Sequence, residues 1–324
     1  MTDQKGKEDI LVVEHLKKYF PVGRGKLLHA VDDVSFSIPK GSTLGLVGES
    51  GCGKTTVGRT LVRLYEPDGG RILFGGRDIS SVKGSDRKEL TRRMQMVYQD
   101  PYASLNPFFT VGEIITEGLE IHKIGSGKKE RMEIAYELLE KVGLHREHAN
   151  RFPHEFSGGQ RQRVGLARSL AVNPDFIVCD EAISALDVSV QAQIVNLLCD
   201  FQNSLGLTYL FIAHDLSMVR YISDRTAVMY LGTLVEIGDN QEVYGHPAHP
   251  YTQGLLQAVP VADPRYEREN SSQAVMAGEV SSPVNPGPGC RFCSRCPRAG
   301  KRCQEEKPVL RDLGGGHLAA CHNL

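Results

Sequence analysis

The stretch Gly48-Glu49-Ser50-Gly51-Cys52-Gly53-Lys54-Thr55 decides the fold class of this sequence. It matches the phosphate-loop pattern G-x-x-x-x-G-K-S/T, and it lies between the apolar run Leu44–Val47 and a helical pattern that continues to about Leu64. In such a loop, backbone N–H groups surround phosphates at the positive end of the helix. Lys54 then reaches the β- and γ-phosphate oxygens and the Thr55 hydroxyl ligates Mg²⁺. The motif predicts binding of a purine nucleoside triphosphate.

The segments around the loop alternate between strand and helix patterns. The run Phe176–Cys179 is short, apolar and bounded by Pro174 and Asp180, as in a buried parallel strand. Apolar residues then fall on one face of a helix over 190–205, and Thr208–Ile212 predicts another strand. This alternation predicts an α/β fold with a mostly parallel sheet covered by helices on both faces.

Composition shifts along the chain predict its domains. Strand patterns stop between Pro101 and Arg168, where a helical pattern continues, so we expect an inserted helical subdomain over about 101–168. Prolines punctuate a Ser-, Gly- and Glu-rich stretch after Val259, and cysteines crowd the last 35 residues. We therefore predict a nucleotide-binding domain over 8–258, an extended linker over 259–289 and a small cysteine-rich domain over 290–324.

Overall composition excludes several classes of protein. The 324 residues carry 38 Lys and Arg against 39 Asp and Glu, a net charge of -1, which excludes a globally basic nucleic-acid binder. No apolar run approaches the ~18 residues that a membrane span needs, and the polar first ten residues do not form a signal peptide. We expect a cytosolic chain that contacts a membrane through another subunit.

Two adjacent carboxylates follow the buried strand that ends at Cys179. Asp180 can hold the Mg²⁺ shell, and Glu181 can activate a water for attack on the γ-phosphate. An Asp-Glu pair at a strand end is more often a cap or a solvated pair. The phosphate loop upstream favours the catalytic interpretation.

The stretch Phe156-Ser157-Gly158-Gly159-Gln160 indicates the family. In the order phosphate loop, Gln99, Ser-Gly-Gly-Gln, Asp180-Glu181 and His214, the sequence resembles the ATP-binding subunit of ABC transporters over about residues 10–258. The resemblance implies an ABC-type ATPase core, in which antiparallel strands accompany the mostly parallel sheet.

The resemblance also implies roles for individual residues. Tyr19 would stack on adenine, Gln99 would contact Mg²⁺ and the attacking water, Glu181 would be the base, and His214 would contact the γ-phosphate. A strand-edge aromatic is the alternative interpretation of Tyr19. The implied catalytic set is Glu181, His214 and Gln99, and the implied Mg²⁺ ligands are Thr55, Gln99 and Asp180. The implied nucleotide contacts are Tyr19, Gly48, Glu49, Ser50, Gly51, Cys52, Gly53, Lys54, Thr55, Thr56, Gln99, Ser157, Gly158, Gly159, Gln160, Asp180 and Asp187.

Some of these residues would act across a dimer. Ser157, Gly158 and Gly159 offer a hydroxyl and unobstructed N–H groups at a helix N-terminus, which suits an anion. The resemblance implies that they close on ATP held by a second chain, with Asp187 also acting across that interface, and that hydrolysis reopens the pair. One departure is Ala182-Ile183, where many relatives have proline after the Asp-Glu pair. This change loosens a turn but removes no ligand.

Longer stretches resemble one subgroup, the dipeptide and oligopeptide permeases. They are Gln99–Pro107, Ser184–Gln193 and Tyr209–Asp215, while Lys17–Pro21 and Arg92–Met96 look more like the second of that system's two ATPase subunits. The implied partners are a paralogous ATPase subunit in a heterodimer, two transmembrane permease subunits and an extracytoplasmic peptide-binding protein, at the cytoplasmic face of the membrane. A related importer of nickel or another small solute is an alternative.

A different class, a metal-sensing or nucleic-acid-binding ABC protein, is a further alternative because basic residues lie among the C-terminal cysteines. Phe292 is the one aromatic residue among them, so stacking platforms are scarce and no nucleic-acid partner is expected.

The C-terminal cysteines predict a metal site. Five of them in a reducing compartment disfavour disulfides. The spacing of Cys290, Cys293 and Cys296 is similar to a ferredoxin run, but Cys303 comes too late to complete it, and a zinc site would more usually pair two such hairpins. Resemblance to the permease ATPases implies a [4Fe–4S] cluster on Cys290, Cys296, Cys303 and Cys321. Cys293 is the alternative fourth ligand, and Zn²⁺ is the alternative metal.

Overall fold

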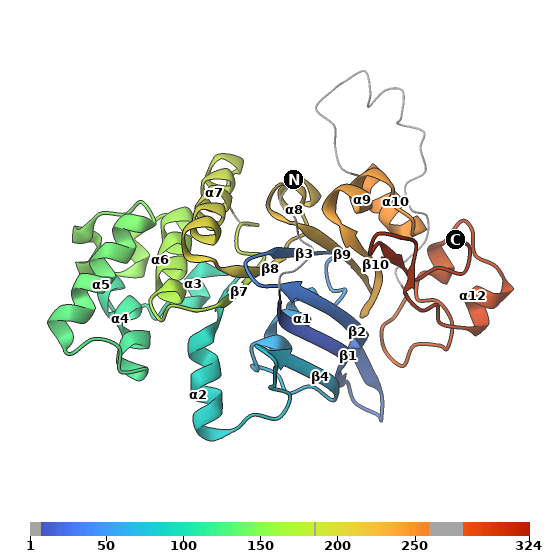
Figure 1. Cartoon of the computed structure of the whole chain (residues 1–324), viewed down its shortest axis with the longest axis horizontal. Helices are drawn as coiled ribbons and strands as arrows, with labels where there is room; N and C mark the ends of the chain where they lie inside the picture. Colours follow the sequence, from blue (N-terminus) through green and yellow to red (C-terminus); the bar gives the residue numbers. More distant parts are fainter. Residues whose placement is uncertain (1–7, 185, 259–280) are drawn as a thin grey trace, which may run out of the picture. The chain divides into compact units, whose positions relative to one another are not determined.

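The computed structural model describes residues 8–184, 186–258 and 281–324, which are drawn in colour in Figure 1. These residues fall into two compact units. Unit 1 contains residue 8 and the segments 39–42 and 81–212, whereas unit 2 contains 9–38, 43–80 and the described residues after 212. Most of the predicted linker, residues 259–280, lies outside the described part. The predicted domain boundaries remain predictions.

Unit 1 contains three parallel strands. They are β6 (Met94–Val97), β7 (Phe176–Asp180) and β8 (Thr208–Ile212), with Met94 opposite Phe176 and Phe176 opposite Thr208. Every residue of β7 and β8 is buried, which explains why their sequences are continuous apolar runs rather than alternating ones. Helix α7 (Val188–Leu205) buries Ile194, Val195, Leu198 and Phe201 on one face. The buried parallel strands predicted from the sequence are confirmed.

The chain between β6 and β7 is helical, and it forms the green part of Figure 1. After α2 (Gly84–Arg93) and β6 come α3 (Pro101–Ser104), α4 (Val111–Ile121), α5 (Lys128–Lys141), two 3₁₀ turns (Arg146–Asn150 and Pro153–Glu155) and α6 (Gly158–Leu170). Helices α4 and α6 each begin with a reciprocal capping box. Residues 98–175, all of them described, contain no strand.

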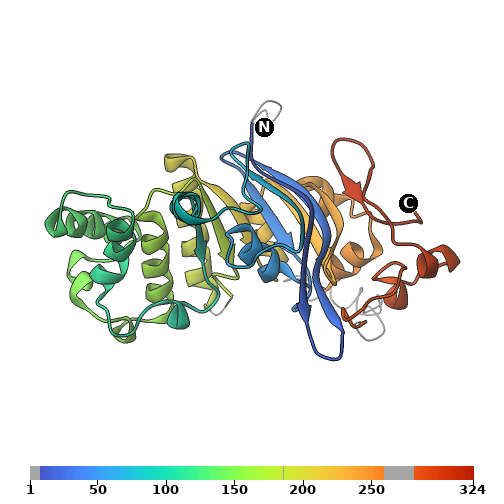
Figure 2. The ribbon, with the colours of Figure 1, turned by 90° about the horizontal axis from the view of Figure 1, so that it is seen from below.

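Unit 2 contains an antiparallel sheet with the order β2-β1-β4-β5. Its strands are β1 (Asp9–Pro21), β2 (Leu27–Pro39), β4 (Gly69–Phe74) and β5 (Arg77–Asp78). Figure 2 shows β1 and β2 as the two long blue strands. The register between β1 and β4 shifts between Glu14 and Lys17, where His15 has a positive φ of 51°.

A second set of strands in unit 2 has the order β11-β12-β10-β9-β3. Here β3 (Thr43–Val47) runs parallel to β9 (Arg225–Tyr230), while β9, β10 (Thr233–Asp239), β12 (Leu318–Ala319) and β11 (Arg311–Asp312) are antiparallel. Helices α1 (Lys54–Leu61), α8 (Leu216–Ile222), α9 (Asn240–Gly245) and α10 (Pro250–Gln257) complete this unit, together with α12 (Lys301–Glu305).

The described C-terminal residues, 281–324, are built into unit 2. Strand β12 pairs with β10, placing Ala319 opposite Glu236, and Val284 forms an isolated bridge with Leu28 of β2. Phe292 is 1% exposed. The small cysteine-rich domain expected over 290–324 remains a prediction. A tail this short has little core of its own, so it packs onto the existing sheets.

Candidate functional site

The phosphate loop of unit 2 joins β3 to α1 and depends on glycine at two close approaches. Gly48 and Gly53 have positive φ angles of 150° and 107°. A Cβ on Gly48 would lie 2.2 Å from the carbonyl oxygen of Met229, and one on Gly53 would lie 2.0 Å from that of Ala30. Any other residue at these positions would have to displace backbone, so the loop pattern is a steric requirement of this turn.

Lys54, the first residue of α1, is buried and held by the loop itself. Its Nζ donates hydrogen bonds to the carbonyl oxygens of Gly48 at 2.8 Å and Glu49 at 3.0 Å. The ammonium group is therefore positioned within the loop, where arriving phosphate oxygens would meet it. Burial raises the pKa of the neighbouring Cys52 thiol despite the charge of Lys54, so Cys52 packs as a neutral side chain.

Tyr19 lies near the end of β1 and belongs to the same unit as the phosphate loop. Its ring stacks on His29 with centroids 4.1 Å apart, and its hydroxyl donates a hydrogen bond to Asp32 Oδ1 at 2.7 Å. Because Ala30, the residue after His29, is the one that Gly53 approaches, β2 connects Tyr19 to the loop. Tyr19 is thus an oriented, half-buried aromatic side chain.

His214 is exposed at the start of the unit 2 segment that precedes α8. The Ala213 N–H donates to the carbonyl oxygen of Leu46 at 3.4 Å, beside the phosphate loop. Asp215 caps α8 by accepting hydrogen bonds from the N–H groups of Ser217 and Met218. These contacts fix the backbone on both sides of His214 at the level where β3 ends.

In unit 1, Gln99 and Glu181 are in direct contact. The Gln99 Nε2 donates to Glu181 Oε2 at 2.6 Å, although the two residues are 82 positions apart. Glu181 has a left-handed φ of 47°, held by its N–H bond to the Ile212 carbonyl at 2.9 Å and by the Ser184 hydroxyl, which donates to the Glu181 carbonyl at 3.0 Å. Such a conformation costs on the order of 1–2 kcal/mol for a residue other than glycine. The surrounding bonds keep this carboxylate beside the Gln99 amide, while Asp180, 1% exposed, ends β7.

The Ser-Gly-Gly-Gln stretch forms the N-terminus of α6. The Ser157 hydroxyl accepts a hydrogen bond from the Gln160 N–H at 3.3 Å, and Gln160 Oε1 accepts one from the Ser157 N–H at 3.0 Å. A Cβ on Gly159 would lie 2.5 Å from Val190 Cγ1 of α7. This capping box was not predicted, although Ser followed three residues later by Gln is its signature.

Asp187 is the N-cap of α7, close to the same stretch. It accepts hydrogen bonds from the Ser189 hydroxyl at 2.6 Å and the Val190 N–H at 3.0 Å, and these bonds lower the pKa of Asp187. Asp187 therefore orients the first turn of the helix on which Gly159 packs.

The sequence-predicted residues thus fall into compact groups within their own units. Unit 2 holds the phosphate loop, Tyr19 and His214, and unit 1 holds the Gln99–Glu181 pair with Asp180, and the Ser-Gly-Gly-Gln stretch with Asp187. Contacts of Glu49 with Tyr251, and with residues of the C-terminal tail, were not predicted. No local pattern signals them, because they join segments about two hundred residues apart.

The C-terminal cysteines are free thiols that lie in one small segment. The Cys290 N–H donates to the Cys303 carbonyl at 2.7 Å, and the Cys293 N–H donates to the Cys290 carbonyl at 3.1 Å. Burial, with the charges of neighbouring cysteines, raises the pKa of Cys290 to about 11. Within residues 8–184, 186–258 and 281–324, no group of three or more His, Cys, Asp or Glu side chains is arranged to hold a metal ion. The described structure therefore does not support the predicted [4Fe–4S] ligand set.

Two family models match the sequence. Residues 31–184 match the ABC transporter model, and residues 235–303 match the model for the oligopeptide/dipeptide transporter C-terminal region. The oligopeptide transport ATP-binding protein OppF of Bacillus subtilis strain 168 is 60% identical over 267 residues, covering 82% of this chain and 87% of OppF. AppF of the same organism, which carries the same description, is 51% identical over 322 residues, 97% of each chain. The chain belongs to the ABC transporter family.

Solved structures support this assignment of the ABC ATPase fold. CbiO1 from Clostridium perfringens, part of the ABC transporter complex CbiONQ, matches with a TM-score of 0.65 at 27% identity, over 74% of this chain and 92% of CbiO1. The ATP-binding cassette MJ0796, in a dimer bound to ADP and phosphate, matches with a TM-score of 0.64 at 27% identity, over 71% of this chain and 98% of that chain. The resemblance inferred from the motifs is confirmed.

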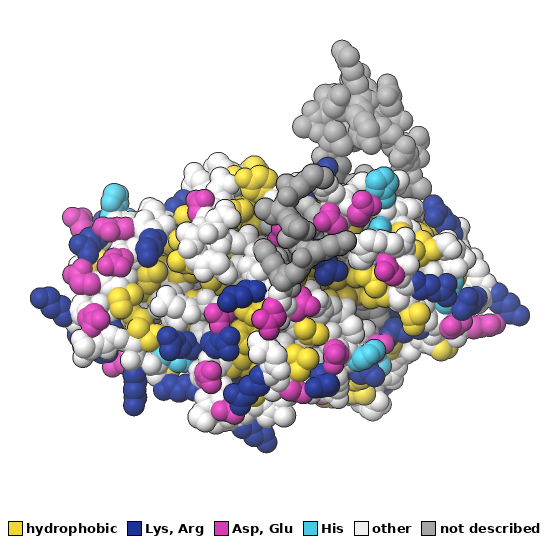
Figure 3. Space-filling model, viewed as in Figure 1, with side chains coloured by type: hydrophobic (Ala, Val, Ile, Leu, Met, Phe, Trp, Pro, Cys, Tyr) yellow, Lys and Arg dark blue, Asp and Glu magenta, His cyan; other side chains and the backbone are white. Residues whose placement is uncertain are grey.

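The helices and one face of this ABC ATPase have a distinct distribution of apolar and charged residues. In the described part of the chain, no helix is both long and apolar enough to cross a bilayer. On the face shown in Figure 3, acidic and basic side chains are interspersed rather than gathered into one basic surface.

Proposed function

We propose that this chain is the ATP-hydrolysing subunit of a membrane importer of dipeptides and oligopeptides. The observation that carries the proposal is the 60% identity to a protein described as an oligopeptide transport ATP-binding protein, together with the match of residues 235–303 to the peptide-transporter C-terminal region. No residue of this chain is assigned to the peptide. Its role is to convert ATP binding and hydrolysis into movement of its partners.

In this proposal the phosphate loop binds ATP and Glu181 starts hydrolysis. Lys54 and the loop N–H groups hold the β- and γ-phosphates, Tyr19 stacks on the adenine, and His214 contacts the γ-phosphate. Glu181 accepts a proton from the attacking water. Gln99, whose Nε2 lies 2.6 Å from Glu181 Oε2, orients this water beside the Glu181 carboxylate.

Magnesium would be held by the Thr55 hydroxyl, the Gln99 amide oxygen and the Asp180 carboxylate. These are hard oxygen donors of the kind that Mg²⁺ prefers, and Asp180 is a buried carboxylate at a strand end. When bound, the ion neutralises charge on the β- and γ-phosphate oxygens.

The transport cycle follows from sharing each ATP between two chains. Ser157, Gly158, Gly159 and Asp187 of one ATPase subunit would close on ATP held by the other, and loss of the γ-phosphate would release them. We propose a heterodimer with a paralogous ATPase subunit, bound at the cytoplasmic face to two transmembrane permease subunits that an extracytoplasmic peptide-binding protein supplies.

Two substitutions test the catalytic assignment. Lys54→Ala removes the cation that holds the phosphates, so both ATP binding and turnover should fall. Glu181→Gln keeps the shape of the side chain but removes the base, so ATP should bind normally while hydrolysis falls by about a hundredfold or more. Near wild-type hydrolysis by Glu181→Gln would show that Glu181 is not the base.

A reconstituted transporter tests the cargo. In proteoliposomes containing the partners, di- and oligopeptides presented with the binding protein should stimulate ATP hydrolysis. Stimulation by nickel and not by peptides would redirect the proposal to a metal importer.

We further propose that Cys290, Cys296, Cys303 and Cys321 bind an iron–sulfur cluster. Support comes from the crowding of five thiols in one short tail and from the resemblance of their spacing to the tails of the peptide permease ATPases. The described thiol positions do not form a ligand group, so the proposal requires local rearrangement on metal binding. Anaerobic purification with iron, sulfide and zinc analysis tests it. Colourless protein with stoichiometric zinc would refute the cluster, and full cluster occupancy in Cys321→Ser would move the fourth ligand to Cys293.

A further inference from the structure

The C-terminal tail contacts the phosphate loop through a partly buried ion pair. Arg295, in the 3₁₀ turn Cys293–Arg295, donates from Nη1 to Glu49 Oε1 at 3.0 Å and Oε2 at 2.9 Å. The Arg295 side chain is 7% exposed and that of Glu49 is 28% exposed, so water reaches this ion pair less than it reaches a pair on the surface. The Tyr230 hydroxyl lies 3.4 Å from the same nitrogen.

The carboxylate, the backbone N–H and the backbone carbonyl oxygen of Glu49 each form a hydrogen bond. Its carboxylate accepts from Arg295, its N–H donates to the Tyr251 hydroxyl at 2.8 Å, and its carbonyl oxygen accepts from Lys54 Nζ at 3.0 Å. The last contact joins the tail to the lysine that is expected to grip the phosphates. A change at Arg295 therefore reaches Lys54 through a single intervening residue.

A second set of tail contacts holds the side chain that anchors Tyr19. Arg291 Nη2 donates to Asp32 Oδ2 at 2.5 Å, and Lys307 Nζ donates to the same oxygen at 3.3 Å. The other carboxylate oxygen, Oδ1, accepts from the Tyr19 hydroxyl at 2.7 Å. Burial alone would raise the pKa of Asp32, but the bond from Tyr19 and the charges of Lys307 and Arg291 outweigh it and lower the pKa to about 2. Asp32 is thus an ionised link between the tail and the aromatic ring.

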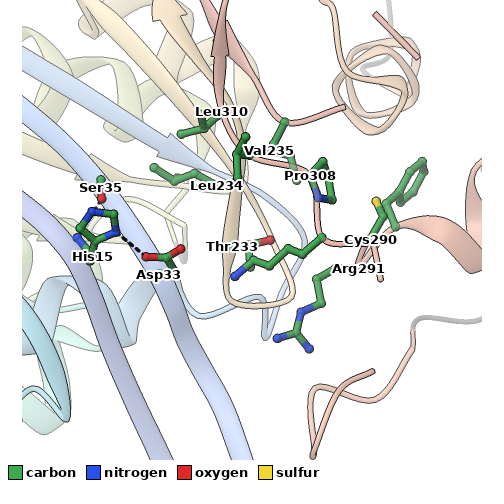
Figure 4. Close-up of a pocket in the computed structure, with 14 residues that line it drawn as sticks. His15, Asp33, Ser35, Thr233, Leu234, Val235, Cys290, Arg291, Pro308 and Leu310 are labelled. Carbon is green, nitrogen blue, oxygen red and sulfur yellow. Dashed lines mark hydrogen bonds and ion pairs between the residues drawn. The ribbon is translucent and has the colours of Figure 1, made fainter. Parts of the chain in front are cut away.

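The tail itself is firmly anchored. Phe292, between the two arginines, packs against Tyr230 and Tyr251 with ring centroids 5.2 and 5.5 Å away. Cys290, Arg291, Phe292 and Lys307 also line one wall of a cavity of ≈ 430 Å³, whose other walls include Asp33 and Thr233 (Figure 4). The packed Phe292 ring fixes the backbone between Arg291 and Arg295 against unit 2.

We propose that the tail residues Arg291, Arg295 and Lys307 are positioning residues for ATP binding. Arg295 positions Lys54, the expected phosphate contact, through Glu49; we call this link the phosphate arm. Arg291 and Lys307 position Tyr19, the expected adenine contact, through Asp32; we call this link the base arm. The inference rests on the proposed function as an ATPase, and it adds that nucleotide affinity depends on a segment about 245 residues after the phosphate loop.

The phosphate arm is tested by a double-mutant cycle on the full chain. Arg295→Ala and Glu49→Gln should each weaken binding of a fluorescent ATP analogue by about tenfold. The double variant should bind it no more weakly than Arg295→Ala alone, because both changes break one link. Arg302→Ala is the matched control, since this tail arginine pairs with Glu306 at the surface and should bind ATP like the wild type. Circular dichroism at the assay temperature establishes that each variant is folded.

Inorganic tripolyphosphate, which has the phosphates of ATP but no base, distinguishes the effects of the two arms on ligand binding. In competition with the ATP analogue, Arg295→Ala should weaken both ATP and tripolyphosphate. Asp32→Ala should weaken ATP but leave tripolyphosphate unchanged. A merely structural tail would lower the melting temperature of both variants without this difference between the two ligands.

The outcomes distinguish the inference from the function on which it rests. If the wild-type chain binds no ATP, the proposed function fails. If the wild type binds ATP and folded Arg295→Ala binds it equally well, or if the effects of Arg295→Ala and Glu49→Gln simply add, the positioning role is overturned while the proposed function stands.

Discussion

His249 shows how burial alone changes the chemistry of a single side chain. It is the N-cap of α10, where Nδ1 accepts a hydrogen bond from the Tyr251 N–H at 3.0 Å. Its backbone N–H donates to Glu236 Oε2 at 2.9 Å, and Glu236 Oε1 lies 2.7 Å from His317 Nε2. The His249 ring also packs against Phe292, with ring centroids 5.7 Å apart. Burial lowers the pKa of His249 from 6.5 to about 4. At neutral pH this histidine is therefore a neutral cap within the core.

We predict that His249 makes the protein less stable in mild acid. The unfolded chain binds the proton near pH 6.5 and the folded chain only near pH 4, so the free energy of unfolding falls as the pH drops through this window. The full difference corresponds to about 3 kcal/mol. His249→Asn keeps a cap acceptor but does not titrate, so its urea-unfolding free energy should fall less between pH 7 and pH 4. Equal slopes for the two proteins would contradict this assignment.

At the scale of elements, helices α4 and α6 of unit 1 begin with the same kind of capping box, but only one of the two boxes has an expected function beyond helix stability. Thr110 caps α4 with Glu113 as its partner, and Ser157 caps α6 with Gln160. Both are hydroxyl caps in reciprocal boxes, so they contribute similarly to helix stability. Only the second is expected to contact nucleotide.

We predict that the two caps separate stability from activity. Thr110→Ala and Ser157→Ala should each lower the free energy of unfolding by about 1 kcal/mol, measured by urea denaturation. Only Ser157→Ala should also lower ATP hydrolysis in the assembled transporter, by about tenfold, because it would remove the proposed hydrogen bond to the γ-phosphate of a partner-bound ATP. Equal hydrolysis by the two variants would reduce Ser157 to a structural cap.

For the whole molecule, assembly is expected to complete the catalytic sites. The chain carries a phosphate loop and a Ser-Gly-Gly-Gln stretch, and the proposed function pairs each with the complementary part of another chain. A chain by itself would therefore lack part of each site.

We predict that the isolated chain is mostly monomeric, as measured by light scattering after size exclusion. Its ATP hydrolysis should be slow, and it should rise about tenfold or more when the paralogous ATPase subunit and the permease subunits are added. A stable, fully active homodimer without membrane subunits would contradict the prediction.

The sequence by itself determined the features that depend on local chemistry. The phosphate loop was recognisable because Gly48 and Gly53 are required by the backbone of that turn, and β7 and β8 were recognisable because strands buried on both faces are continuously apolar. The motif order also identified the family, which the comparisons confirmed.

Only the tertiary structure decided the contacts between distant segments. Gln99 meets Glu181, Arg295 meets Glu49, and β12 extends the strands of unit 2 next to β10. A short-range pattern carries no information about a partner 82 or 246 positions away, because such pairs form only when packed elements bring them together. The tail illustrates the reason. Its cysteine spacing is visible in the sequence, but the burial of Phe292 depends on an apolar surface that includes Tyr230, which only the folded unit 2 supplies.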